Sequence, residues 1–385
     1  MKIIKNLRSH CVSTSHLSIN QLLFIFLFIG FSATASAQEE VKATVDTNDA
    51  TGLLIKAGNF KCDSAEANFK KNNPKVANKF YSEAIKDYKK AVKLSPTSAE
   101  ANYRLALAQI KTKEYKAAIL NFDKALLADP ERGDFFRERG VAQMGLGVDS
   151  IAIKDFNKAI DKNYDDYQAY YYRAMIKYKG KNPQNALEDL THAIESKPNY
   201  KEAYLRRGKI YLERVKDYVL ALNDFNKYIE LDPDNMEAYL LRGKTNYYGG
   251  AYKSAEKDLS RYIDMEPNNV DALITRATAR INLANYSGAV RDLDDALKID
   301  PKNVIALMNR GTAKGAMKNY TGALEDLDMA IKLKFDYSSA YINRALVKYS
   351  NHDKKGACKD LEKADSLNNE KAADLLEQYC NDGRK

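Results

Sequence analysis

Residues that carry catalysis or bind metals are scarce in this sequence. Its 385 residues include four histidines, four cysteines and no tryptophan. His10 and His16 lie in an N-terminal segment that we expect to be removed, and His192 and His352 stand far apart. The spacing of histidines, cysteines and carboxylates fits no zinc site, and no pair of nucleophile and base can be argued. The sequence therefore predicts no enzyme, no metal site and no cofactor.

Two short patterns look like ligand loops but lack the context that such loops need. The stretch Gly145 to Gly147 follows a helical pattern, whereas a nucleotide-binding loop follows a strand. The acidic cluster Asp292–Asp295 looks like a calcium site, but Leu293 and Ala296 interrupt the required ligand pattern. We expect a turn at the first and a solvated helix face at the second.

Blocks of charge of one sign are also absent. Lys and Arg number 61 and Asp and Glu 52, a formal net charge of +9, and the signs alternate along the chain. A nucleic-acid-binding arm is a basic block, so nucleic acid is not an expected partner. With 45% hydrophobic and 29% charged residues, the chain is too apolar to be disordered and too charged to cross a membrane many times.

The first 37 residues have the pattern of an export signal. Lys2, Lys5 and Arg8 form a basic start, Leu22–Phe31 is an apolar run, and 35–37 are small residues. The apolar run is shorter than the ~20 residues of a membrane span, so we expect cleavage and no stable span afterwards. The alternative is a retained membrane anchor.

The remaining chain repeats itself every 34 residues. One column is alanine nine times in succession, and only the step from Ala186 to Ala221 is 35 residues. A second column holds only alanine or glycine, a third holds only large side chains, and proline ends most units. The alanine column consists of Ala84, Ala118, Ala152, Ala186, Ala221, Ala255, Ala289, Ala323 and Ala357. Such a period indicates stacked structural repeats.

Each unit contains two helical patterns. In one unit they are 238–248 and 252–265, and Ala255, Leu259 and Tyr262 give the second pattern one apolar face. Small residues allow two helices to approach closely, and a helix pair of this size must stack on its neighbours to bury its apolar face. The sequence predicts an all-α chain of stacked helical hairpins.

These columns resemble the tetratricopeptide repeats. The match lies in the small-residue columns, the terminal prolines and two aromatic columns, and it covers about 66–369. The aromatic columns are Phe136, Tyr170, Tyr204 and Tyr239, and Tyr218, Tyr252, Tyr286 and Tyr320. The resemblance implies a right-handed superhelical α-solenoid whose first helices line a concave groove.

The repeats divide the chain into segments. Pro74 falls where the first helix of the first unit should run, and one extra residue lies between Glu213 and Asp217. The expected segments are a signal peptide at 1–37, an N-terminal linker at 38–62, a degenerate first repeat at 63–96, eight repeats of 34–35 residues at 97–369, and a capping helix and tail at 370–385.

Two charged columns accompany the repeats. Each arginine lies one residue before the Ala or Gly contact of the first helix, and each aspartate lies three residues after the alanine of the second. Where the arginine is replaced by Leu105, the aspartate is replaced by Asn121, so we expect the two to touch. An alternative is a row of arginines that binds an acidic ligand. The predicted pairs are Arg139–Asp155, Arg173–Asp189, Arg207–Asp224, Arg242–Asp258, Arg276–Asp292, Arg310–Asp326 and Arg344–Asp360.

Three cysteines remain once Cys11 leaves with the signal. Export exposes thiols to oxidising conditions. If 370–379 stacks as a capping helix, Cys358 and Cys380 come from neighbouring helices and a disulfide between them would fasten the cap. Cys62 then stays free or pairs with another chain. The alternative is three inert thiols.

The resemblance places apolar and aromatic side chains of the first helices on the concave face, which indicates a partner site. The alternative is that many of them belong to the core between helices. A column that includes Lys209 and Lys244 contains no asparagine, which disfavours the clamp by which some family members hold a terminal carboxylate. The candidate groove residues are Tyr171, Met175, Tyr178, Leu205, Lys209, Leu212, Leu240, Lys244, Tyr247, Ile274 and Ile281.

We therefore expect a non-catalytic, exported scaffold that binds a protein or peptide in its groove, in the periplasm, the cell envelope or the extracellular space of a bacterium. The alternative is a self-associating structural subunit or accessory factor of an envelope assembly. A third hypothesis is an enzyme accessory domain.

Overall fold

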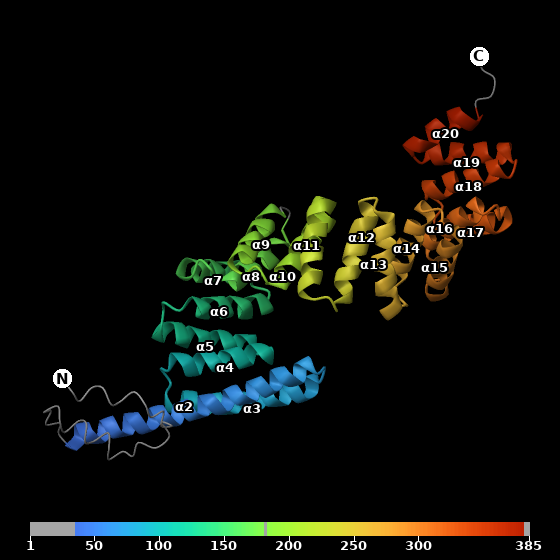
Figure 1. Cartoon of the computed structure of the whole chain (residues 1–385). Coiled ribbons are helices and arrows are strands. Elements are labelled where there is room, and N and C mark those ends of the chain that lie inside the picture. The colour runs from blue at the N-terminus through green and yellow to red at the C-terminus, as the bar shows by residue number, and fades with distance from the viewer. Residues whose placement is uncertain (1–34, 181–182, 381–385) are drawn as a thin grey trace, which may run out of the picture. The chain divides into compact units, whose positions relative to one another are not determined.

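Helices make up most of the part of the chain that the structure describes (Figure 1), and one of its elements is a π-helical turn. The computed structural model describes residues 35–180 and 183–380, and no strand occurs in these ranges. The elements are α2 (Ala35–Lys70), α3 (Pro74–Leu94), α4 (Ala99–Lys111), α5 (Tyr115–Ala128), α6 (Gly133–Gly145), α7 (Asp149–Lys162), α8 (Tyr167–Lys177), α9 (Gln184–Ser196), α10 (Lys201–Ile210), η1 (Tyr211–Val215), α11 (Tyr218–Leu231), α12 (Met236–Tyr248), α13 (Tyr252–Met265), α14 (Val270–Asn282), α15 (Tyr286–Ile299), α16 (Val304–Ala316), α17 (Tyr320–Leu333), α18 (Ser338–Ser350), α19 (Lys354–Ser366) and α20 (Glu370–Cys380).

The chain forms two units, which divide between Val148 and Asp149. Helices α2 to α6 belong to the first unit and α7 to α20 to the second. In each unit a first helix packs against a second helix, which then packs against the first helix of the next repeat. The predicted all-helical solenoid of helix-turn-helix repeats is confirmed.

Local signals begin and end these helices. Asn269 caps α14 by accepting a hydrogen bond from the backbone N–H of Ala272, and Asn285 caps α15 in the same way. Between α14 and α15, Ala284 has a φ of 58°. The corresponding turn of the preceding repeat has Gly250 with a φ of 79°, a conformation that glycine adopts at little cost.

The small-residue columns lie where helices cross. Ala255 and its equivalents in the neighbouring repeats are fully buried. A methyl group at Gly243 would lie 2.8 Å from Cγ of Leu259, so only a very small residue fits there without a shift of the leucine. The large residue of the second helix fills the space that the small residue of the first helix leaves.

The N-terminal region corrects two expectations. Residues 38–62, expected to be a linker, are part of the long helix α2. This helix packs along α3, where the Tyr88 hydroxyl donates a 2.8 Å hydrogen bond to Asn59 and lies 3.5 Å from the Cys62 sulfur. Pro74 interrupts no helix, because it occupies the first turn of α3, where its missing N–H leaves no hydrogen bond unmade.

The extra residue of the fourth full repeat is absorbed as a π-helical turn. The element η1 follows α10 directly, and Lys216 then takes a φ of 64° before α11 begins. The Lys216 conformation matches that of the turn residue in the other repeats, so the extra residue is taken up within η1. A single π turn is the usual way in which a helix accommodates one inserted residue.

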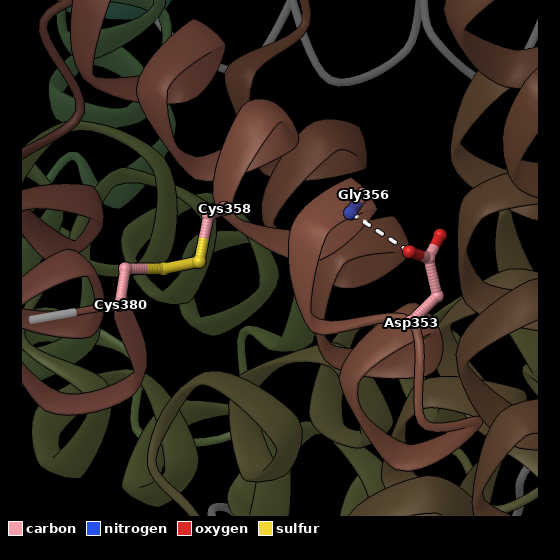
Figure 2. The surroundings of a disulfide bond; sticks show 4 residues. All are labelled: Asp353, Gly356, Cys358 and Cys380. Carbon is pink, nitrogen blue, oxygen red and sulfur yellow. Dashed lines mark hydrogen bonds between the residues drawn. A yellow bond between two sulfur atoms is a disulfide. The ribbon is translucent and has the colours of Figure 1, made fainter. Parts of the chain in front are cut away.

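A covalent bond fastens the last helix. The sulfur atoms of Cys358 in α19 and Cys380 in α20 form a disulfide, as Figure 2 shows. Leu375 and Leu376 pack against the same core cluster, and the rings of Tyr349 and Tyr379 lie 4.5 Å apart. Ala372 is the one buried residue of α20, so the disulfide fastens a helix with little buried side-chain surface.

Reduction of this disulfide should release α20. The bond closes a loop of 22 residues, for which loop-closure entropy gives about 3 kcal/mol. We expect faster amide hydrogen exchange in α20 for the Cys380→Ser variant than for the unsubstituted chain, with exchange in α12 and α13 unchanged. Cys62→Ser is the control and should leave α20 protected. Equal protection of α20 in all three proteins would contradict the prediction.

Candidate partner-binding face

The predicted ion pairs form a ladder along the repeats. Nε and Nη2 of Arg242 donate to the two carboxylate oxygens of Asp258 at 2.8 and 2.7 Å, and the Asp258 side chain is only 7% exposed. A planar guanidinium suits this bidentate geometry. The same geometry occurs in Arg173–Asp189, Arg207–Asp224, Arg276–Asp292, Arg310–Asp326 and Arg344–Asp360. The pair Arg139–Asp155 stays a prediction.

Each arginine also reaches the second helix of the preceding repeat. Nη1 of Arg242 in α12 donates a 2.8 Å hydrogen bond to Asn226 in α11, while its other nitrogen atoms bind Asp258 in α13. One side chain thus joins three helices. The acceptors of the seven arginines are Asp123, Asn157, Thr191, Asn226, Ser260, Asp294 and Asp328. Sequence reasoning missed these acceptors, although they form a polar column with the same period.

A second cation serves most of the buried aspartates. It lies four residues after the arginine on the same first helix: Arg280 donates to Asp292 at 2.7 Å, and Lys314 pairs with Asp326 at 2.8 Å. Lys177 and Lys348 occupy the same position beside Asp189 and Asp360. The arginines of the ladder are already paired with buried aspartates. The structure therefore favours a structural role for these arginines over a role in binding an acidic ligand.

Asp224 and Asp258 lack this second cation, but Asn246 donates a 3.2 Å hydrogen bond to Asp258 in its place. The position four residues after Arg207 is Tyr211, at the start of η1, and carries no charge. Burial raises the pKa of the Asp224 carboxyl above its ordinary value, and its hydrogen bonds with Arg207 offset only part of that rise. The inserted residue therefore coincides with a weaker rung of the ladder.

Removal of one arginine should destabilise the repeat around it. In Arg242→Ala the buried Asp258 loses its partner, and we expect a loss of about 3 kcal/mol in the free energy of unfolding. Urea denaturation followed by circular dichroism measures this. The exposed Arg291→Ala is the matched control and should change stability by less than about 0.5 kcal/mol. Equal effects of the two variants would contradict the structural role.

The raised pKa of Asp224 should be visible in the pH dependence of the stability of the fold. Because the pKa of Asp224 is raised in the folded chain, the native state binds this proton more tightly than the unfolded chain does, and its stability falls as pH rises through that folded pKa. Tyr211→Lys adds the missing cation and should lower the pKa, whereas Tyr211→Phe should leave it unchanged. Carboxyl NMR titration checks both variants, and a pKa for Asp224 at or below 3.8 in the unsubstituted chain would contradict the prediction.

In the second unit, the first helices α12, α14, α16 and α18 pack successively against one another, and an ion pair links α10 to α12. The two candidate lysines hold this face together. Nζ of Lys209 pairs with Glu237 of the next first helix, and Lys244 pairs with Asp271 in the same way. Further along, amide groups take over this role: Asn309 donates to Thr278 and Asn343 to Thr312, each at 3.0 Å.

Most of the apolar candidates are half-buried on this face. The exception is Leu212, which is 5% exposed and packs with Phe225 and Leu241 in the core. Its assignment to the groove is wrong, because the π turn η1 directs it inward. The half-buried candidates are Tyr171, Met175, Tyr178, Leu205, Leu240, Tyr247, Ile274 and Ile281. Leu205, Leu240, Tyr247, Ile274 and Ile281 also pack against core clusters.

Tyrosines gather at two places in the second unit. Around α8, the ring of Tyr171 lies 5.5 Å from that of Tyr172 and 5.2 Å from that of Tyr200, and burial raises the pKa of Tyr171. Tyr167 contacts Tyr200 and accepts a 2.9 Å hydrogen bond from Lys197. We call Tyr167, Tyr171, Tyr172 and Tyr200 the α8 tyrosine cluster.

The second gathering lies at the end of α12. The rings of Tyr218 and Tyr248 stack at 5.9 Å, and Tyr247 contacts both Tyr248 and Tyr252. We call these four residues the α12 tyrosine cluster. Sequence reasoning assigned Tyr171 and Tyr247 to the groove but not their neighbours, several of which lie at the ends of other helices.

Tyr178, which ends α8, belongs to neither cluster. Its hydroxyl donates a 3.0 Å hydrogen bond to Glu213 in η1, and Arg214 lies over its ring at 5.6 Å from the centroid. Burial raises its pKa. The irregular turn η1 is therefore tied to the first helix of the preceding repeat.

Metal ligands and membrane spans were sought among the described residues. In the ranges 35–180 and 183–380, no group of three or more His, Cys, Asp or Glu side chains is placed to hold a metal ion. No helix in these ranges combines the length and the apolar content needed to cross a membrane.

Three family models match the chain, and together they cover more than half of it. A TPR repeat model matches residues 77–113, and a tetratricopeptide repeat model matches 99–132. A second tetratricopeptide repeat model matches 150–201, 176–235 and 274–347. None of the curated proteins matches the chain significantly.

Solved structures of similar proteins include a peptide-binding repeat protein. YrrB, described as a TPR protein with an unusual peptide-binding site, is 25% identical over 48% of this chain and 95% of its own, with a TM-score of 0.45. The C-terminal part of a TPR repeat-containing protein from Cytophaga hutchinsonii is 23% identical over 64% of this chain and 98% of its own, with a TM-score of 0.49. Both scores are below 0.5, so the family assignment rests on the sequence models.

Proposed function

The chain belongs to the tetratricopeptide repeat family, and from that premise we propose that it is a non-catalytic scaffold that binds a protein or peptide partner. Proteins of this family generally mediate interactions between proteins. The proposed binding surface is the face of the first helices in the second unit. The partner is a segment that presents apolar or aromatic side chains.

The two tyrosine clusters carry this proposal. Tyrosine combines a large apolar ring with a hydroxyl group and loses little conformational entropy on binding, which makes it frequent in interfaces. Within each cluster, the rings are already in contact with one another before a partner binds. A partner therefore meets rigid rings rather than flexible chains, and such preorganisation favours affinity.

We also propose that the protein is exported to the envelope or surroundings of a bacterial cell. Two independent observations support this. The N-terminal segment has the order basic, apolar and small that export signals share. The disulfide between Cys358 and Cys380 is typical of oxidising compartments and rare in the cytosol.

Three tyrosines on the face test the proposal. We expect the variant Tyr171→Ser, Tyr178→Ser, Tyr247→Ser to lose at least about tenfold in partner capture, since rings at the centre of an interface carry much of its energy. The partner is first identified by crosslinking in native cells and is then titrated by calorimetry. Tyr164→Ser is the control, because this ring is 67% exposed and contacts Tyr170 and His192, which belong to neither cluster.

Two results would contradict the assignment of the face. One is unchanged affinity of the triple variant. The other is an equal loss in the control. Circular dichroism of both variants shows whether the helices are intact, so that loss of fold is distinguished from loss of the binding rings.

A further inference from the structure

Helix α2 carries two apolar seams on opposite sides. The inner seam faces α3 and includes the buried residues Thr51, Gly58 and Ala65. The outer seam is exposed along its whole length and follows the alternating steps of four and three residues that are typical of helix pairs. The outer seam consists of Asp49, Leu53, Lys56, Phe60, Asp63, Ala67 and Lys70, all of which are exposed.

The outer seam has an unusual composition for a solvent-facing surface. Leu53 is 60% exposed and Phe60 is 72% exposed. The outer surface of a terminal repeat is normally polar, because no further repeat covers it. At the other end of the repeats, by contrast, helix α20 covers the outer surface of the last repeat. The seam therefore leaves an apolar row without a partner among the described residues.

The charges of the seam identify the partner. One row reads Asp49, Lys56, Asp63 and Lys70, and the structure gives none of these side chains an ion pair among the described residues. Parallel pairing in register would place each charge against its own kind. Antiparallel pairing about a two-fold axis beside Phe60 places Lys56 against Asp63 and Asp49 against Lys70, each contact occurring twice.

We propose that α2 is the interface of a homodimer, in which two copies pair their outer seams antiparallel. The two Phe60 rings meet at the axis, and Leu53 of each copy meets Ala67 of the other. The charged row flanks this apolar row with four complementary contacts. The paired segment, residues 49–70, is about 32 Å long at 1.5 Å per residue. A surface that is complementary to itself under a two-fold operation gives a closed dimer.

Charge reversal with rescue tests both the partner and the register. The whole chain is expressed with its N-terminal segment, so that any processing takes place, and its mass is followed by sedimentation equilibrium. We expect dimers for the unsubstituted chain. Lys56→Asp or Asp63→Lys alone should weaken association by at least about tenfold, since each creates two contacts between like charges. The double variant should restore it.

A cysteine at the axis provides a second measurement. Phe60→Cys should give a disulfide-linked dimer on mild oxidation. Leu53→Cys should not, because the two copies of residue 53 lie about 20 Å apart along the paired helices. The unsubstituted chain, which contains the same Cys62, is the control. A monomer at all concentrations, equal behaviour of single and double charge variants, or equal crosslinking at 53 and 60 would overturn the proposal.

Discussion

The buried carboxylate on most second helices is the constraint on which the rest of the structure depends. A charge that is removed from water must be paired and hydrogen-bonded, because an unpaired one is very unfavourable. Here the partner is an arginine that also reaches the preceding repeat, as Arg242 does with Asp258 and Asn226. The ladder therefore specifies the distance and rotation between successive repeats, while the alanine and glycine contacts allow the close approach.

This constraint explains why the first helices are free to bind a partner. Small residues and the paired charges of the ladder determine how successive repeats pack against one another. Side chains on the exposed side of the first helices vary from repeat to repeat without disturbing the stack. In the second unit that variation has produced tyrosines on α8 and α12 and amide–hydroxyl links between α14, α16 and α18. Repetition thus supplies the frame, and departures from it supply the specific surface.

The sequence was sufficient for the frame because its columns are periodic. The pairing of Arg with Asp followed from the unit in which Leu105 and Asn121 replace both, and the structure shows why: Asn121 donates to Gln109 instead, in a neutral buried pair. Features that do not follow the 34-residue repeat were harder to predict. Residues 38–62 looked like a linker because α2 has seams on two sides and no single apolar face. Leu212 was misplaced because a π turn rotates its side chain, and spacing alone does not reveal such a turn.

The central claim is that the face of the first helices in the second unit is the working surface. Amide hydrogen exchange with and without the captured partner measures this directly. The account predicts added protection in α8, α10 and α12, whose side chains carry or adjoin the tyrosine clusters. Protection confined to the second helices α9, α11 and α13 would place the partner on the opposite side and contradict it.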